Sequence, residues 1–320
     1  MKFHHLQILA PLLLAPVSPA AVNIDYVNIG NAGNPNDPST GYGFVPYNYQ
    51  ISRNETTISQ YAEFLNVKAR TDPYGLYNTG MATDAHSAGI TRSGSSGNYT
   101  YSVLSGAGNR PITYVSWFDA ARFTNWLHNG QGNGSTETGA YTLGGATSGI
   151  FTKNVNATVW LPSENEWYKA AYYDPTPGAG GGDNYWRYAT QSDALINNTV
   201  SANYIDGDYA VTQSPTGSSS QNYLTNLGAY GTASDSFYGT NDQTGNVLEW
   251  NDAVISGTQR GRRGGAWSTV LNQQSALTRD FGVPTTEVSV VGFRVASVPE
   301  PTSVVLTILF STGLILLRKR

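Results

Sequence analysis

The sequence predicts a single loop-rich α+β domain over residues 22–297. Glycine is abundant, with 35 residues, whereas charged residues and aromatic residues each make up 12% of the chain. This composition favours a globule held together by buried aromatic side chains over a helical bundle or a disordered chain. Helical and strand-like patterns alternate with turn-rich segments at 71–109 and 190–240, and no internal repeat or charged linker divides the domain.

The first part of the domain is expected to hold two strands and a helix. Apolar residues alternate over 22–29 and 44–52, and a loop rich in Asn, Gly and Pro separates the two strands. After Thr57 the period changes to that of a helix, and Thr57 and Gln60 have the spacing of a capping box. The buried face of this helix is expected to carry Ile58, Tyr61, Ala62 and Leu65.

Two further capped helices are expected in the middle of the chain. Ser116 is a natural N-cap with Asp119 at the third helical position, and Ser163 forms a capping box with Glu166. The spacing of apolar residues indicates which side chains face inward. These are Trp117, Ala120, Ala121, Thr124 and Leu127 in the first helix, and Trp167, Ala170 and Ala171 in the second.

The densest signal lies in three C-terminal stretches, which read DQTGNVLEW at 242–250, RGRRGGAW at 260–267 and GFRVA at 292–296. In the first stretch, a turn residue, a glycine, a carboxylate and a large aromatic residue indicate a backbone folded tightly around something small and positive. The alternative is a tight turn that leads into a buried strand, with Glu249 paired to an arginine such as Arg263 or Arg294. Spacing alone favours this alternative.

Together with three earlier blocks, these stretches resemble the formylglycine-generating enzyme family, also called sulfatase-modifying factors. The earlier blocks read ETTISQYAEF at 55–64, RPITYVSWFDA at 110–120 and WLPSENEWYKAA at 160–171. One departure is Trp160, which stands where the family usually has an arginine, so the ion pair of that arginine is missing. The resemblance implies a single α+β domain of C-type-lectin-like ancestry with a large share of irregular chain.

The resemblance also implies a structural calcium ion. In the family, this ion is held by the first side chain of the C-terminal loop, two backbone carbonyls and the glutamate. The corresponding positions here are Asp242, Gly245, Val247 and Glu249. Two carboxylates and two carbonyls, completed by water, suit calcium, which takes about six to eight hard oxygen ligands. A second family site would begin at Asn203 and the carbonyl of Tyr204.

The chain contains no cysteine. Family members that oxidise a sulfatase cysteine to formylglycine bind copper through two cysteines, and the resemblance places these at Thr269 and Gln274. Neither side chain supplies the thiolate that a soft copper(I) ion prefers. His86 and His128 are isolated, which leaves no histidine pair for a metal. We therefore expect no copper, no catalytic residue and a non-catalytic protein. The alternative is an enzyme of the family, either the oxidase or another activity on the same fold.

Both ends of the chain carry the pattern of export signals. Residues 1–20 combine an early lysine, an apolar run and small residues at the end, as in a secretory signal peptide. Residues 298–320 hold Pro-Glu-Pro, an apolar stretch over 302–317 with the composition of a transmembrane helix, and a basic end. This tail resembles the PEP-CTERM sorting signal of bacteria, which an exosortase recognises and is thought to remove. A permanent single-pass anchor is the alternative.

The expected protein is therefore exported to the bacterial envelope or matrix, where the domain binds a protein or glycan partner. The two ends contain four of the 18 basic and one of the 22 acidic residues, which leaves 14 basic and 21 acidic residues and a net charge of −7. This acidic balance disfavours nucleic acid as a partner. Six of the seven tryptophans lie in family blocks and are expected in the core, whereas Trp186 lies next to a glycine-rich loop and is expected to be exposed.

Overall fold

Two four-stranded sheets and three helices of at least nine residues dominate the computed structural model, which describes residues 21–194, 204–205 and 208–299. In chain order the elements are β1 (Tyr26–Ile29), β2 (Tyr49–Ser52), α1 (Ile58–Lys68), α2 (Gly80–Thr83), β3 (Ile90–Ser93), β4 (Thr100–Val103), α3 (Trp117–His128), β5 (Val159–Trp160), α4 (Glu164–Tyr172), η1 (Gly180–Gly182), β6 (Tyr204–Ile205), β7 (Asp208–Tyr209), η2 (Gly231–Ser234), β8 (Leu248–Ile255), β9 (Gln259–Arg263), η3 (Leu271–Gln274), β10 (Asp280–Gly282), β11 (Val291–Phe293) and β12 (Ala296–Ser297). The expected single loop-rich α+β architecture is confirmed.

The first sheet brings the two ends of the described chain together. Its strand order is β1-β2-β12-β5, and β2 runs antiparallel to both β1 and β12. Ile51 in β2 lies opposite Val27 on one side and Ala296 on the other. The expected signal peptide at 1–20 lies outside the described residues. The expected sorting tail at 298–320 also lies outside them, except for its first two residues.

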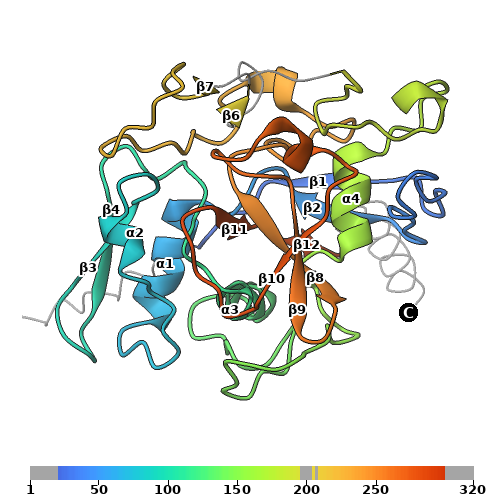
Figure 1. The fold of residues 1–320 in the computed structure, drawn as a ribbon. Helices are drawn as coiled ribbons and strands as arrows, with labels where there is room; N and C mark the ends of the chain where they lie inside the picture. Colours follow the sequence, from blue (N-terminus) through green and yellow to red (C-terminus); the bar gives the residue numbers. More distant parts are fainter. Residues whose placement is uncertain (1–20, 195–203, 206–207, 300–320) are drawn as a thin grey trace, which may run out of the picture.

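The second sheet has the order β10-β9-β8-β11, in which β8 is antiparallel to β9 and parallel to β11. Figure 1 shows α1 and α4 on opposite sides of β8 and β9. The C-terminal stretches singled out in the sequence therefore form the centre of the molecule. Two short hairpins, β3-β4 and β6-β7, are separate from both sheets.

The three predicted helix N-termini are confirmed, each with a reciprocal capping box. In α1, the Thr57 hydroxyl accepts from the Gln60 N–H at 3.0 Å, and the Gln60 side chain accepts from the Thr57 N–H at 2.8 Å. A cap of this kind stabilises a helix by about 1 kcal/mol. The expected inward faces are buried, except that Leu127 is only half-buried near the end of α3.

Aromatic packing fills the core, as the composition predicts. Tyr61 and Phe64 of α1 contact Phe123 of α3 with ring centroids 6.1 and 5.4 Å apart, and Phe123 lies 5.4 Å from Phe293 of β11. The six tryptophans expected in the core are buried. Trp186 is half-buried, so its ring is the most accessible of the seven.

The two N-terminal strands begin later than the alternation predicts. β1 starts at Tyr26 rather than residue 22, and β2 at Tyr49 rather than residue 44. The Val22 N–H makes no strand hydrogen bond and instead donates to the Gln131 Oε1 at 2.7 Å. Pro46 has no N–H to give to a ladder, which delays the second strand.

None of the helices in the described residues is long and apolar enough to cross a membrane. The stretch at 302–317 is not among those residues.

Candidate functional site

The loop that precedes β8 is as tightly folded as its sequence predicts. Asp242 and Asn246 both adopt a left-handed backbone, with φ of 58° and 56°, which Asp and Asn tolerate better than most residues. The Gly245 N–H donates to the Gly264 carbonyl at 2.8 Å, and the Trp267 N–H donates to the Asn246 carbonyl at 2.9 Å. The loop is therefore fixed against the segment that follows β9.

Glu249 lies in β8 with its side chain fully buried, and Arg294 is its partner. The Arg294 Nε lies 2.6 Å from the Glu249 Oε2, and the Arg294 Nη2 lies 2.8 Å from the Oε1. The Trp167 indole N–H donates to the Oε2 at 2.7 Å. Arg263, the other arginine considered from the sequence, pairs with Glu164 at 2.7 Å. The buried ion pair of the alternative interpretation is thus present, with Arg294.

The guanidinium of Arg294 also joins three segments of backbone. Its Nη1 donates to the carbonyls of Ser52 and Arg53 at 3.1 and 2.9 Å, and its Nη2 donates to the Asn241 carbonyl at 2.8 Å. The Asn241 N–H in turn donates to the Arg53 carbonyl at 2.8 Å. The segment after β2 therefore runs beside the start of the 242–250 loop.

This arrangement brings in Glu55, which the sequence reasoning missed as a site residue. Only 2% of Glu55 is exposed, and neither carboxylate oxygen has a hydrogen-bond partner among the described residues. Burial raises the pKa of Glu55 well above its ordinary value, the charges of Asp242 and Glu249 raise it further, and Arg294 opposes them. In the sequence, the 55–64 block indicates a helix cap and the family resemblance, and Glu55 is marked only as an acidic residue two positions before the N-cap Thr57.

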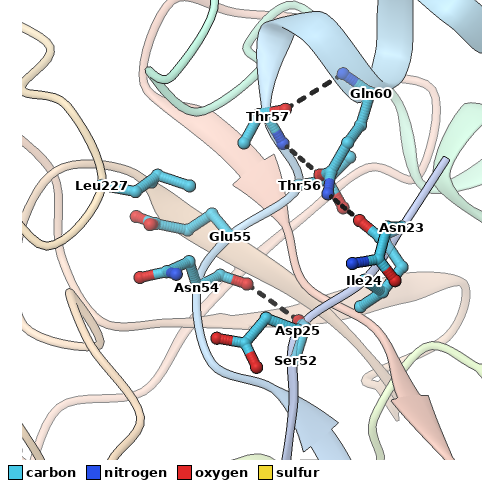
Figure 2. Close-up of a pocket in the computed structure, with 10 residues that line it drawn as sticks. All are labelled: Asn23, Ile24, Asp25, Ser52, Asn54, Glu55, Thr56, Thr57, Gln60 and Leu227. Atoms are coloured by element: carbon cyan, nitrogen blue, oxygen red, sulfur yellow. Dashed lines mark hydrogen bonds between the residues drawn. The ribbon is translucent and has the colours of Figure 1, made fainter.

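A cavity of about 130 Å³ opens beside Glu55. Figure 2 shows the Glu55 carboxylate next to the Asn54 side chain and close to Leu227, with no contact drawn to the carboxylate. The Asn54 Oδ1 and the Thr56 Oγ1 are also buried and, within the described chain, without a hydrogen-bond partner. Four unpartnered oxygens thus belong to three consecutive residues.

Asp242 is buried as well, with 3% exposed. Its Oδ2 accepts from the Gly228 N–H at 2.7 Å. Burial raises the pKa of Asp242 to about 6, although the Gly228 hydrogen bond and Arg294 counteract this, and Glu249 raises it again. Gly228 follows Leu227, so the Asp242 carboxylate and the cavity beside Glu55 share one stretch of wall.

The charges of this centre do not balance. When ionised, the carboxylates of Glu55, Asp242 and Glu249 carry −3 against the +1 of Arg294, which leaves −2 in a buried region. A buried charge is stable only when it is paired, neutralised by a proton or bound to a metal ion. Across the described residues, no three His, Cys, Asp or Glu side chains form a group that could hold a metal ion by themselves.

The two positions of the copper-binding cysteines lie together in the structure. The Gln274 Nε2 donates to the Thr269 carbonyl at 2.8 Å, and the Gln274 side chain is fully buried. A Cβ on Gly265 would lie 2.4 Å from the Gln274 Cγ, so these side chains occupy the space over that glycine. A cavity of about 250 Å³ opens beside Thr269, with Arg279 and Asp280 in its wall.

The second predicted calcium position cannot be placed, because Asn203 lies outside the described residues and Tyr204 is described only as part of β6.

Fold and site together define a domain of the sulfatase-modifying-factor class. The family model described as the sulfatase-modifying factor enzyme 1-like domain matches residues 27–298, and the chain belongs to this family. No curated protein matches the chain.

Two solved structures show the same fold. The crystal structure of CarF is 21% identical, with a TM-score of 0.57, over 88% of this chain and all of that one. The Treponema denticola variable protein 1 is 18% identical, with a TM-score of 0.52, over 89% of this chain and all of that one. At these identities the likeness concerns the fold alone.

Proposed function

We propose that this protein is an exported, non-catalytic, calcium-stabilised domain of its family that binds a protein or glycan partner or has a structural role. The observation that carries the proposal is the buried, unbalanced set of carboxylates around Arg294 in a chain that has no cysteine.

We place the proposed calcium ion beside Arg294. Glu55 has two buried oxygens without a partner in the described chain. A divalent cation would neutralise the charge of −2 that the centre would carry with all three carboxylates ionised. Asp242, Glu249 and the backbone carbonyls of Gly245 and Val247 are the further ligands that we propose. Because calcium accepts about six to eight oxygens in flexible geometry, carboxylates that are already hydrogen-bonded can still contribute.

The role of the ion would be mechanical and electrostatic. Glu55 follows β2, Asp242 and Gly245 lie in the loop before β8, and Arg294 follows β11. An ion bound between the first two segments would tie them together and would add positive charge to that of Arg294. The chain has no cysteine and therefore no disulfide, so the ion would take the place of a covalent tie in an exported protein.

The non-catalytic part of the proposal rests on residue chemistry. The carbonyl, hydroxyl and amide groups of Thr269 and Gln274 form hydrogen bonds, whereas copper(I) binding in this reaction requires thiolates. A specific observation keeps an enzyme as the second candidate, namely the open cavity of about 250 Å³ beside Thr269. Incubation with copper and a peptide that carries a sulfatase motif decides the point, because conversion of the peptide cysteine to an aldehyde would refute the non-catalytic assignment.

Export and sorting rest on the two ends of the sequence. We propose that residues 1–20 are removed as a signal peptide and that residues 298–320 are recognised by an exosortase as a PEP-CTERM signal. β1 and β12 flank β2 in the first sheet, and a cut before β1 or after β12 would leave the pairing of both strands with β2 in place.

Thermal unfolding in calcium and in a chelator tests the central claim. We expect a lower melting temperature in the chelator and recovery on addition of calcium but not of an equal concentration of magnesium, which demands a stricter octahedral geometry. Equal melting temperatures in all three conditions would contradict the calcium site.

A further inference from the structure

A third cavity lies away from both Glu55 and Thr269. Its volume is about 170 Å³, and it is formed by the loop after β1, the turn around η1 and the chain after η3. Figure 1 shows the first two of these segments on the α4 side of the molecule. The proposed calcium centre uses none of the residues that line this cavity.

Trp186 gives the cavity an aromatic wall. The indole is half-buried, its N–H donates to the Asp174 Oδ2 at 3.1 Å, and the Trp186 backbone N–H donates to the Tyr172 carbonyl at 2.9 Å. The ring is therefore fixed before any ligand arrives. Leu277, of which 58% is exposed, adds a second apolar surface.

Two aspartates in the cavity are held in position through one oxygen each. The Asp183 Oδ1 accepts from the Tyr185 N–H at 2.9 Å, and the Asp193 Oδ1 accepts from the Arg187 N–H at 2.9 Å. No described residue donates to the second oxygen of either side chain. These oxygens are available as acceptors for ligand hydroxyl groups.

Arg187 supplies donors in the same cavity. Its side chain is exposed, its guanidinium lies 5.7 Å from the centroid of the Tyr188 ring, and it forms no ion pair with a carboxylate of the described chain. Together with Asp37, the cavity holds three carboxylates and one guanidinium, a charge of −2. This charge repels phosphates and acidic sugars.

We propose that this cavity binds one terminal residue of a neutral glycan. The apolar face of the sugar ring packs against Trp186, hydroxyl groups donate to Asp183 and Asp193, and Arg187 donates to a hydroxyl or ring oxygen. The volume suits one ring, since pockets for drug-sized ligands measure about 300–1,000 Å³. The inference rests on the proposed role as an exported binding domain and names its ligand class and site.

Binding to an array of neutral and uronic-acid oligosaccharides, followed by titration of the best neutral ligand, tests the inference. Trp186 is the one tryptophan of the seven that is not buried, so ligand binding should protect tryptophan fluorescence from acrylamide quenching. We expect Trp186→Ala to weaken binding at least 10-fold and Asp183→Asn to weaken it several-fold. Phe281→Ala, an exposed aromatic on β10 outside this cavity, should have no effect.

Several results would overturn the inference. These are no binding to any neutral glycan, preference for the uronic-acid ligands, or equal binding by Trp186→Ala and the wild type. The melting temperature of each variant, recorded with and without calcium, separates this failure from failure of the proposed function. A calcium-stabilised protein that binds no glycan would refute only the glycan site. If Trp186→Ala does not fold, Asp183→Asn and the quenching assay on the wild type decide.

Discussion

The substitution Glu55→Gln distinguishes a calcium centre from a metal-free cluster of buried carboxylates. The change keeps the shape of the side chain and removes one negative charge from the group around Arg294. Without a metal ion, the wild-type protein buries two unpartnered carboxylate oxygens beside Asp242 and Glu249. Because burial raises the pKa of Glu55 well above its ordinary value, folding at neutral pH must protonate this side chain, whereas Gln needs no proton. Glu55→Gln should therefore raise the free energy of unfolding, by about 1.4 kcal/mol for each pH unit above the ordinary pKa of a glutamate.

With calcium the advantage of the variant should shrink or disappear. A ligand at 100 times its Kd stabilises the folded state by about 2.7 kcal/mol, which corresponds to a shift in Tm of roughly 5–10 °C for a domain of this size. If the loss of one carboxylate weakens binding about 100-fold, the gain falls to about 0.4 kcal/mol. Glu55→Gln should therefore be more stable than the wild type in chelator and gain much less from calcium.

Differential scanning calorimetry in chelator and in calcium measures both the stability of the metal-free protein and the stability gained from calcium. Glu63→Gln is the matched control, because Glu63 is exposed on α1 and should respond to calcium as the wild type does. If Glu55→Gln gains as much from calcium as the wild type, Glu55 is not a ligand. If it is less stable than the wild type in chelator, the assignment of Glu55 as unpartnered is wrong.

The other predictions concern Glu249, Asp119 and the two positions of the lost cysteines. Glu249→Ala should destabilise the protein by about 3–5 kcal/mol even in chelator, because it leaves Arg294 buried without its carboxylate. A drop in Tm no larger than the drop that chelation causes in the wild type would contradict this prediction. Burial, and then Glu287, raise the pKa of Asp119 to about 7, so the folded state favours the protonated acid. Stability should fall as pH rises from about 4 to 7, by up to about 4 kcal/mol, and Asp119→Asn should flatten that profile in urea titrations. The double variant Thr269→Cys, Gln274→Cys should bind copper(I) in a competition assay with a chromogenic chelator, whereas the wild-type protein should not. If the double variant binds no copper(I), the two positions are not equivalent to the copper ligands of the family.

Local signals in the sequence were sufficient for the helices and insufficient for the site. A capping box depends on residues three apart, so Ser116 with Asp119 identifies a helix start without any tertiary information. The partner of Glu249 depends on packing between distant segments. Arg263 is directly opposite Glu249 in the β8–β9 register, yet its side chain pairs with Glu164 of α4 instead. The partner of each arginine therefore follows from the tertiary structure and not from the sequence around it.

Glu55 was missed for a related reason. An acidic residue near a helix start is normally explained by the favourable electrostatics of the helix N-terminus, which gives no reason to expect burial. Its environment is created by residues almost 190 positions away, at Asp242 and Glu249. A residue whose partners arrive through tertiary packing leaves no periodic pattern in its own neighbourhood.

The residues around Arg294 and the pair Thr269 and Gln274 belong to different parts of the fold. Arg294 donates to the Ser52 carbonyl at the end of β2 and to the Asn241 carbonyl before β8, and it pairs with Glu249 in β8. These contacts tie the first sheet to the second, and loss of Glu249 would leave Arg294 buried without its carboxylate. Thr269 and Gln274 belong to a short connection after β9, where their hydrogen bonds are local to that connection. The hydrogen bonds of Thr269 and Gln274 therefore do not depend on the residues around Arg294.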